Sequence, residues 1–515
     1  MRGAGKNSVL RSTAGLALAG IVSKAVGAFY RIPLTNVLGA EGIGLYQTFF
    51  PVYALFLTFT SAALPTVVGR YVAYSDALGI AIPETRAAAK RVAFALGATG
   101  LVFTALLAYP VAALQSRPQV WQGYLIVAPA VLAVTLSAYY KGYFIGKGRM
   151  TSNALSQTAE QAVKLAVGLT AAYLLAPKGI VLAVYGALFA VTASEAAGLF
   201  FMAAAYGKDV GKSNNFPSRV DKRIYYDIIR TMFPIAAAAL VVPVSGFIDS
   251  FLIVRLLAAG GEELSSATAA YGIYSGAVGT VINLPVVVAI SLAVAVIPRV
   301  SAGVAKGEYV GVNKATGLTL GAGLAVAVPC FFALLILSDD VINLLYPGFS
   351  AEEAGRAAEL LKIQSFNVIA ASLVQLLCGI LQALGAGRSA ACYLAVSVAL
   401  KTAVQAVLLP RMGIVAAPIA QLTMYALATA LALVRYTELV GKNPQLAKSV
   451  SKIALGGVIM GVCVRVVSLV VNGGAARLAL SAVFGGAAYF ATLALTGVFG
   501  KEALSSIFGR AAKGE

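Results

Sequence analysis

Apolar segments of about 20 residues recur along the whole chain, separated by short polar stretches. A segment of this length crosses the hydrocarbon core of a bilayer as an α-helix. The segments lie at 9–30, 43–69, 92–114, 121–140, 152–176, 180–206, 228–257, 269–297, 312–338, 357–384, 390–409, 413–436, 452–471 and 477–499. The pattern predicts an all-α polytopic membrane protein with about 14 transmembrane helices.

Composition agrees with this fold class. Of 515 residues, 60% are hydrophobic and 11% are charged, whereas soluble domains carry about 25% charged residues. The chain has no histidine, and its four cysteines are scattered through apolar segments without a CxxC pair. We therefore expect no metal site, no disulfide framework and no cofactor.

The formal charge of +19 does not indicate a nucleic-acid partner, because the basic residues cluster in short loops between apolar segments. They occupy alternate loops, at 2–11, 70–91, 141–149, 208–223, 299–314, 388, 442–448 and 501–513. The other loops are poor in basic residues and carry acidic ones, such as Glu262 and Asp339. The positive-inside rule then places both termini in the cytoplasm.

An internal repeat organises the chain. "GYFIGKGRM" (142–150) matches "GILQALGAGR" (379–388), and each is followed by a helix with a lysine, Lys164 and Lys401, 237 residues apart. "GAFYR" (27–31) likewise aligns with "GFIDS" (246–250). We predict an N-terminal lobe (1–206), a cytoplasmic linker (207–227), a C-terminal lobe (228–436) and two additional helices with a tail (437–515). Parallel repeats place a substrate path between the lobes and suit alternating access.

The stretch "SKAVGAFYRIPLTNVLGAEGIGLYQTFFPVYALFLTFTSAALP" (23–65), together with "GILQALGAGR", resembles the stage V sporulation protein B and polysaccharide-biosynthesis membrane proteins. These are relatives of the lipid II flippase in the multidrug/oligosaccharidyl-lipid/polysaccharide exporter superfamily. The resemblance covers essentially the whole chain. It implies two lobes around a central cavity lined by the first, second, seventh and eighth helices.

Lys24 lies within the first apolar segment, and Arg31 follows directly at its end. Lys24 and Arg31 are two helical turns apart and share one face, so they need anionic partners or an anionic ligand. The motif Ser23-Lys24-Ala25-Val26-Gly27 resembles an S-[RK]-x-x-G pattern, which implies that Lys24 holds the pyrophosphate of a lipid-linked sugar. Two other interpretations remain open: Lys24 pairs with a buried acid, and Arg31 snorkels to the outer interface.

Further candidate substrate-binding residues lie on the other helices of the implied cavity. We expect Asp249 to face Lys24 or Arg31 as a latch that substrate releases, with a structural ion pair as the alternative. Arg255, six residues along, points away from Asp249. Hydroxyl and amide groups on the second and eighth helices add uncharged hydrogen-bonding capacity; the candidates are Thr58, Thr280 and Asn283.

A second, weaker set of candidates concerns ion coupling. Glu160 and Lys164 are spaced i,i+4 and are predicted to neutralise each other. Glu195, in the segment 180–206, and Lys401, in the segment 390–409, are the other two candidates of this set.

We interpret the chain as a flippase for an undecaprenyl-pyrophosphate-linked saccharide, with lipid II of peptidoglycan biosynthesis as the first candidate, acting as a monomer in cell-wall biogenesis, cell shape or sporulation. One alternative is a cation-coupled multidrug exporter of the same superfamily. Another is an enzyme of lipid-linked sugar polymerisation, but that chemistry needs a general base or metal-binding carboxylates. Only 20 acidic residues are present, most of them in loops. A transporter, not an enzyme, fits best.

The predicted topology has a direct test. A single cysteine placed in the 207–223 loop of an otherwise cysteine-free chain is expected to resist a membrane-impermeant maleimide in intact cells. It should react after permeabilisation. Labelling of this loop from outside intact cells would overturn the orientation.

Overall fold

The computed structural model describes residues 4–78, 83–211, 217 and 220–498, and for residues 4–26 and 28 it describes the backbone alone. Within these ranges the chain is helical and has no β-strand, which confirms the all-α class. Eleven helical stretches of the described chain are long and apolar enough to cross a membrane. Two of them, 29–78 and 387–440, have 50 and 54 residues, about twice the length of one crossing. The count of fourteen therefore stays a prediction.

Prolines determine where several helices end. Each of three helices ends at the residue four positions before a proline: α1 (Ala4–Ser61) before Pro65, α3 (Pro83–Leu106) before Pro110, and α8 (Lys222–Ala239) before Pro243. Proline has no N–H to bond the carbonyl four residues earlier, and each of these three prolines lies in the first turn of the next helix, where that N–H is not needed. Pro33 and Pro51, by contrast, lie inside α1. The predicted single helices 43–69, 92–114 and 228–257 were wrong in this respect, because each is divided between two helices.

The predicted first and second segments are joined rather than separated by a loop. Helix α1 runs from the first segment into the second as far as Ser61, with one non-helical residue, Gly39, at φ 66° and ψ −177°. A positive φ of this size favours glycine. Gly39 therefore bends the chain between two long helical runs without interrupting them by a loop.

The helices pack into two units. Unit 1 comprises 1–280 and 394–417, and unit 2 comprises 281–393 and 418–515. Besides α1, α3 and α8, unit 1 contains α2 (Leu64–Leu78), α4 (Ala108–Leu114), α5 (Gln122–Gly146), α6 (Met150–Leu175), α7 (Ile180–Val210), α9 (Val241–Ala259), α10 (Leu264–Tyr271), a π-helical segment (Gly272–Val278) and the second part of α15 (Gly387–Met412).

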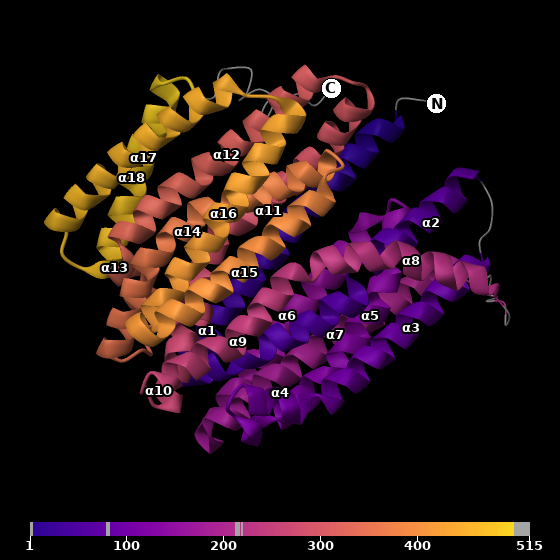
Figure 1. Cartoon of the computed structure of the whole chain (residues 1–515), viewed down its shortest axis with the longest axis horizontal. Coiled ribbons are helices and arrows are strands. Elements are labelled where there is room, and N and C mark those ends of the chain that lie inside the picture. Colours follow the sequence, from indigo (N-terminus) through magenta and orange to yellow (C-terminus); the bar gives the residue numbers. More distant parts are fainter. Residues whose placement is uncertain (1–3, 79–82, 212–216, 218–219, 499–515) are drawn as a thin grey trace. The chain divides into compact units, whose positions relative to one another are not determined.

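Helix α1 is the centre of unit 1, and it packs against α5, α6, α7, α9, α10 and the π-helical segment. One apolar core of this unit joins α1 to α5, α6 and α7 around Tyr30, Phe49 and Tyr124. A second core joins α2, α3, α5, α7 and α8 around Tyr139 and Met202. Figure 1 shows α5 and α7 together among the indigo and purple helices.

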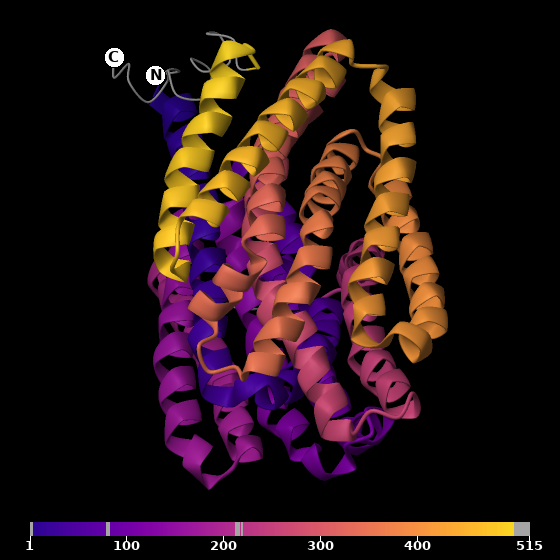
Figure 2. The same ribbon diagram turned by 90° about the vertical axis from the view of Figure 1, so that its left-hand side faces the viewer.

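Unit 2 contains most of α11 (Gly279–Ala305), and α12 (Tyr309–Ile336), α13 (Ser338–Leu345), α14 (Ala351–Ala383), α16 (Ala416–Val440), α17 (Pro444–Val470) and α18 (Gly474–Leu495). Helix α12 packs against α14 and α17, and α17 packs against α18, as both views show (Figures 1 and 2). Val328, Met460 and Tyr489 lie in their shared core. Arg477 of α18 bonds Asp340 of α13 at 3.2 Å.

The two packed units do not coincide with the lobes expected from the repeat. Helices α9 and α10, which follow the predicted linker, pack against α1 within unit 1. Both ends of the predicted linker 207–227 are helical, because α7 continues to Val210 and α8 begins at Lys222. The lobe boundaries rest on the repeat and stay a prediction.

The repeat has a clear structural counterpart at its matched turns. Gly148 and Gly385, 237 residues apart, both have positive φ, 67° and 79°. After Gly148, the N–H of Arg149 bonds the carbonyl of Phe144, and after Gly385 the N–H of Ala386 bonds that of Leu381. A glycine with positive φ and a bond of this span form a Schellman-type helix end. The two sequence matches thus encode the same turn.

Close approach of α1 to the elements that follow α9 requires glycine. A Cβ on Gly44 would overlap the carbonyl of Thr268 in α10, whereas one on Gly207 in α7 would meet nothing. Gly44→Ala is expected to lower the free energy of unfolding by about 1–3 kcal/mol through overpacking. Gly207→Ala should leave it unchanged or raise it by about 0.5–1 kcal/mol. Melting in detergent measures both, and equal melting temperatures would contradict the close contact.

Candidate functional site

Arg31 lies on α1 at the first core of unit 1. Its guanidinium carbon stands 4.9 Å from the centroid of the Phe50 ring, and its side chain stays partly exposed. The other cation predicted on this segment, Lys24, lies outside the described side chains. Arg31 makes no ion pair with any side chain that the structure describes, so it is neutralised neither by Asp249 nor by another described acid.

Lys164 of α6 lies beside Arg31. Its ammonium stands 5.8 Å from the centroid of the same Phe50 ring and 5.7 Å from that of Tyr30. Like Arg31, it is partly exposed and has no ion pair within the described part of the chain. Ring faces attract cations by about 0.5–2 kcal/mol, but they do not neutralise charge. Two cations therefore meet at one ring with their charge uncompensated by direct contact.

Glu160 does not form the predicted pair with Lys164. Its carboxylate accepts from Lys141 of α5 at 2.9 Å and from the Ser156 hydroxyl at 2.9 Å. A Cβ on Gly198 of α7 would overlap this carboxylate. The glycine leaves room for Glu160 to turn toward α5 and α7, while Lys164 turns toward α1. The i,i+4 spacing permitted a local pair, but tertiary packing gives each charge a different neighbour.

Glu195 of α7 is the fifth charge of this group. It lies on the helix that packs against α6, which carries Glu160 and Lys164. We call Arg31, Lys141, Glu160, Lys164 and Glu195 the α1–α7 charge cluster. It holds three cations and two carboxylates from four helices, and the cations without a direct partner are those nearest α1.

Asp249 and Lys401 form a separate buried pair. Lys401 of α15 is 2% exposed, and its ammonium bonds the Asp249 carboxylate of α9 at 2.5 Å and the Ser245 hydroxyl at 3.1 Å. Asp249 therefore does not pair with Arg31, and the structural ion pair, left open as the alternative, is what forms. The predicted contact of Asp249 with Lys24 lies outside the described side chains. Spacing along the chain gives no hint of a partner 152 residues away.

The repeat relates the two lysines. Lys164 and Lys401 occupy matched positions 237 residues apart. In the alignment of "GAFYR" with "GFIDS", Tyr30 matches Asp249. Each lysine thus faces the same repeat position, a neutral ring in one half and a carboxylate in the other. The lysine of the second half is neutralised, whereas the lysine of the first half is not.

The remaining predicted residues are dispersed. Thr280 is buried, and its hydroxyl bonds the Gly276 carbonyl of its own helix at 2.6 Å. Thr58 is partly exposed, and Arg255 and Asn283 are exposed. Asn283 belongs to unit 2 and the charge cluster to unit 1. None of these four is brought into the charge cluster by a described contact.

Sequence reasoning missed Phe50 and Lys141. Phe50 lies in a predicted helix, where an aromatic residue is ordinarily a core residue. Lys141 lies in a predicted basic loop and was given no role in a site. Their importance comes from neighbours on other helices, Arg31 and Lys164 for Phe50, and Glu160 for Lys141.

Comparison with known proteins gives the family. The polysaccharide biosynthesis protein family matches residues 9–304, more than half of the chain. The chain belongs to this family. The MatE family matches residues 234–407. Stage V sporulation protein B of Bacillus subtilis (strain 168) is 26% identical over 476 residues, covering 89% of this chain and 88% of the relative.

Lipid II flippase MurJ of the same organism is 25% identical over 418 residues, covering 77% of this chain and 76% of the relative. A solved structure of lipid II flippase MurJ in an inward closed conformation matches with TM-score 0.73 at 14% identity, covering 96% of this chain and 99% of that one. A multidrug resistance MATE family transporter matches with TM-score 0.61 at 14% identity, covering 82% and 98%. The chain has the fold of these transporters and is a multi-pass bacterial membrane protein.

The buried pair has a clear energetic signature. Lys401→Met leaves Asp249 buried without its partner, so the free energy of unfolding is expected to fall by about 3–5 kcal/mol. The double variant Asp249→Asn with Lys401→Met removes both charges and should recover most of that loss. Melting of the purified variants in detergent measures this coupling.

Arg255→Met is the matched control, because Arg255 is an exposed cation on the same helix as Asp249. Its expected effect is within about 0.5 kcal/mol of zero. A double variant as unstable as Lys401→Met would show that the two charges do not act as a pair.

Proposed function

We propose that this chain is a flippase that moves an undecaprenyl-pyrophosphate-linked saccharide across the cytoplasmic membrane by alternating access. Lipid II is the first candidate substrate. The observation that carries the proposal is the meeting of Arg31 and Lys164 over the Phe50 ring, with no ion pair to either cation among the described residues. Membership of the polysaccharide biosynthesis protein family supports the same substrate class.

Electrostatics favours an anionic ligand at this place. Two adjacent cations within an apolar helical bundle repel each other and lose hydration, so both effects are relieved when a dianion binds between them. Arg offers a planar fork and Lys a point charge, a combination suited to a pyrophosphate with several oxygens. Both side chains are partly exposed and therefore accessible to a ligand.

The repeat gives a reason for the asymmetry. In the C-terminal half the matched lysine is occupied by Asp249. In the N-terminal half the matched lysine faces the ring of Tyr30, which stabilises the ammonium but leaves its hydrogen-bonding protons available. We therefore assign headgroup binding to Arg31 and Lys164, together with Lys24 as the sequence predicts. The Asp249–Lys401 pair has a structural role.

To move a headgroup from one membrane face to the other, the protein must release it again after binding. Glu160 and Glu195 are the two carboxylates of the charge cluster and belong to α6 and α7, whereas Phe50 belongs to α1. We propose that these carboxylates compete with the pyrophosphate for the Lys164 ammonium. Competition of this kind keeps binding weak enough for release, as conduction and transport sites require. In this proposal the chain acts as a monomer, and both of its termini lie in the cytoplasm.

A cation-coupled multidrug exporter is the second candidate, favoured by the MatE match over residues 234–407. Such a protein transports organic cations, which Arg31 and Lys164 would repel. Export of a cationic dye by vesicles that do not move the lipid-linked saccharide would favour this candidate over the flippase.

Translocation of labelled lipid II in vesicles containing only this protein tests the proposal. A charge-assisted hydrogen bond contributes about 1.5–3 kcal/mol, and each 1.36 kcal/mol is tenfold in rate. Arg31→Gln, Lys164→Gln and Lys24→Ala are therefore each expected to slow translocation at least about tenfold. Lys24→Arg should keep partial activity, because the charge is retained.

Lys178→Gln removes an exposed cation from the same unit and serves as the control, with unchanged translocation expected. The melting temperature of each variant separates binding from folding. Variants at Arg31 and Lys164 that melt early but still move lipid II when present in excess would refute headgroup binding by these residues.

A further inference from the structure

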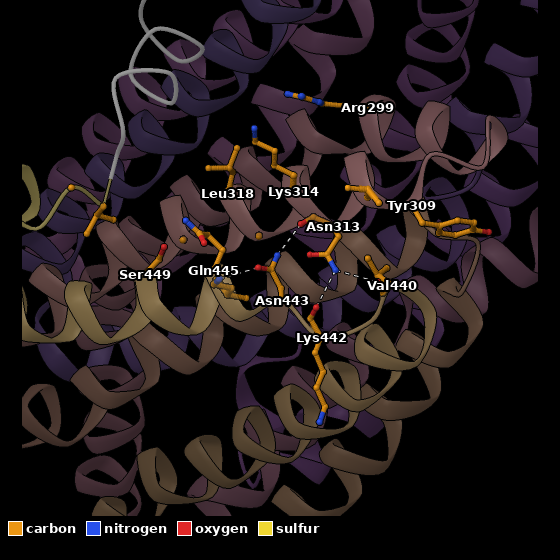
Figure 3. Close-up of a pocket in the computed structure, with 16 residues that line it drawn as sticks. Arg299, Tyr309, Asn313, Lys314, Leu318, Val440, Lys442, Asn443, Gln445 and Ser449 are labelled. Atoms are coloured by element: carbon orange, nitrogen blue, oxygen red, sulfur yellow. Dashed lines mark hydrogen bonds between the residues drawn. The ribbon is translucent and has the colours of Figure 1, made fainter.

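A cationic pocket lies within unit 2, away from the residues used above. Its volume is about 850 Å³. The first turns of α12 and α17 form its walls, with the connection from α16 to α17 between them and Arg299 of α11 at one edge (Figure 3). The lining includes Arg299, Lys314 and Lys442, and no lining residue that the structure describes is acidic. The pocket therefore concentrates positive charge.

The floor of the pocket is held by a network of amide hydrogen bonds. Asn313 of α12 donates to the Val440 carbonyl at 3.1 Å, and Asn443 donates to the Asn313 carbonyl at 2.9 Å. The Asn443 side-chain oxygen also accepts from the N–H of Leu446 and caps α17. A Cβ on Gly317 would overlap the Asn443 amide. The glycine permits this contact, so the pocket is a built feature rather than a chance gap between loops.

The cations of the pocket are not neutralised. Arg299 and Lys314 are exposed, and neither forms an ion pair with the described side chains. In Figure 3 the Lys314 side chain extends toward Arg299, whereas Lys442 points away from both. Gln445 and Ser449 of α17 line the same pocket and can donate hydrogen bonds. The N-terminus of α17 adds partial positive charge.

Apolar surface adjoins these cations. Leu318 and Val310 of α12 are 39% and 87% exposed, and both line the pocket. A Cβ on Gly321, one turn beyond Gly317, would meet nothing within 4 Å, so this side of α12 is open. A site with cations at one end and open apolar surface beside them suits an amphiphile with an anionic head.

We propose that this pocket binds the phosphate headgroup of an anionic lipid of the cytoplasmic leaflet. Basic loops 299–314 and 442–448 belong to the predicted cytoplasmic side, where anionic lipids attract Lys and Arg. Basic pockets between helices on that side are suited to phosphate headgroups. Arg299 and Lys314 bind the phosphate, Gln445 and Ser449 complete its hydrogen bonds, and an acyl chain follows α12 past Gly321. The site uses none of the residues assigned to transport.

The experiment measures binding of phosphatidylglycerol to the purified full chain in neutral detergent, with phosphatidylcholine and inorganic phosphate in parallel. Arg299→Gln with Lys314→Gln is expected to weaken phosphatidylglycerol binding about tenfold or more, because charge-assisted hydrogen bonds are lost. Gly321→Leu should weaken it as well by filling the open space, and the melting temperature without lipid should not fall.

Lys306→Gln with Lys448→Gln is the matched control. Both lysines are exposed, belong to the same predicted cytoplasmic loops and do not line the pocket. Unchanged binding in this variant supports the site. An equal loss would show nonspecific attraction and overturn the proposal.

Two other results would also overturn it. Inorganic phosphate that binds as tightly as phosphatidylglycerol would identify a soluble anion as the ligand. Phosphatidylglycerol binding that appears only after removal of residues 499–515 would identify the C-terminal segment of the chain as the occupant.

Discussion

The cost of placing an ammonium inside an apolar helical bundle governs the arrangement of unit 1. Removing a charge from water costs several kcal/mol unless partners replace its hydration. Lys401 meets this cost with Asp249 and the Ser245 hydroxyl. Lys164, at the matched position of the repeat, has two aromatic faces and a nearby cation instead. The lysine at this repeat position thus has a carboxylate partner in one half and no ion pair among the described side chains in the other, which is why the proposed anion site lies in the first half.

Close packing of α1 makes this arrangement possible. Tyr30, which faces Lys164, is 2% exposed and packs where Gly168 of α6 leaves no side chain. Both cations lie over the ring of Phe50, which belongs to the same long helix as Tyr30, beyond the bend at Gly39. Glycines on α6 and α7 admit the Tyr30 ring and the Glu160 carboxylate. Small residues that let helices approach closely are the ordinary device of membrane bundles, and here they also decide which charges meet.

The two units each contain a pair of cations, and the surroundings of the two pairs differ. In unit 1, Arg31 and Lys164 are partly buried among helices, where we propose that they bind the headgroup of a transported lipid. In unit 2, Arg299 and Lys314 are exposed beside an open apolar surface. Exposed cations keep their hydration and are screened by salt, so each contributes less binding energy to an anion than a partly buried cation does. Burial, rather than charge alone, separates the two roles.

By itself, the sequence determined the elements that depend on neighbours along the chain. Apolar runs predicted the helices, since backbone groups in a bilayer must bond internally. The repeat predicted the paired turns, which have positive φ at Gly148 and Gly385 because both end a helix in the same way. The helix break before Pro243 also depends on the local sequence, although the prediction of one helix over 228–257 overlooked it. The family resemblance was also carried by contiguous motifs and is confirmed.

Only the tertiary structure decided which charges meet. Glu160 bonds Lys141 rather than Lys164, and Asp249 bonds Lys401, because each partner comes from a different helix. Helical spacing fixes the face on which a side chain lies, but not the helix that packs against that face. Phe50 acquired its role in the same way, from cations on α1 and α6. Charge pairing in a helical bundle is a property of packing, and packing joins residues that the sequence keeps far apart.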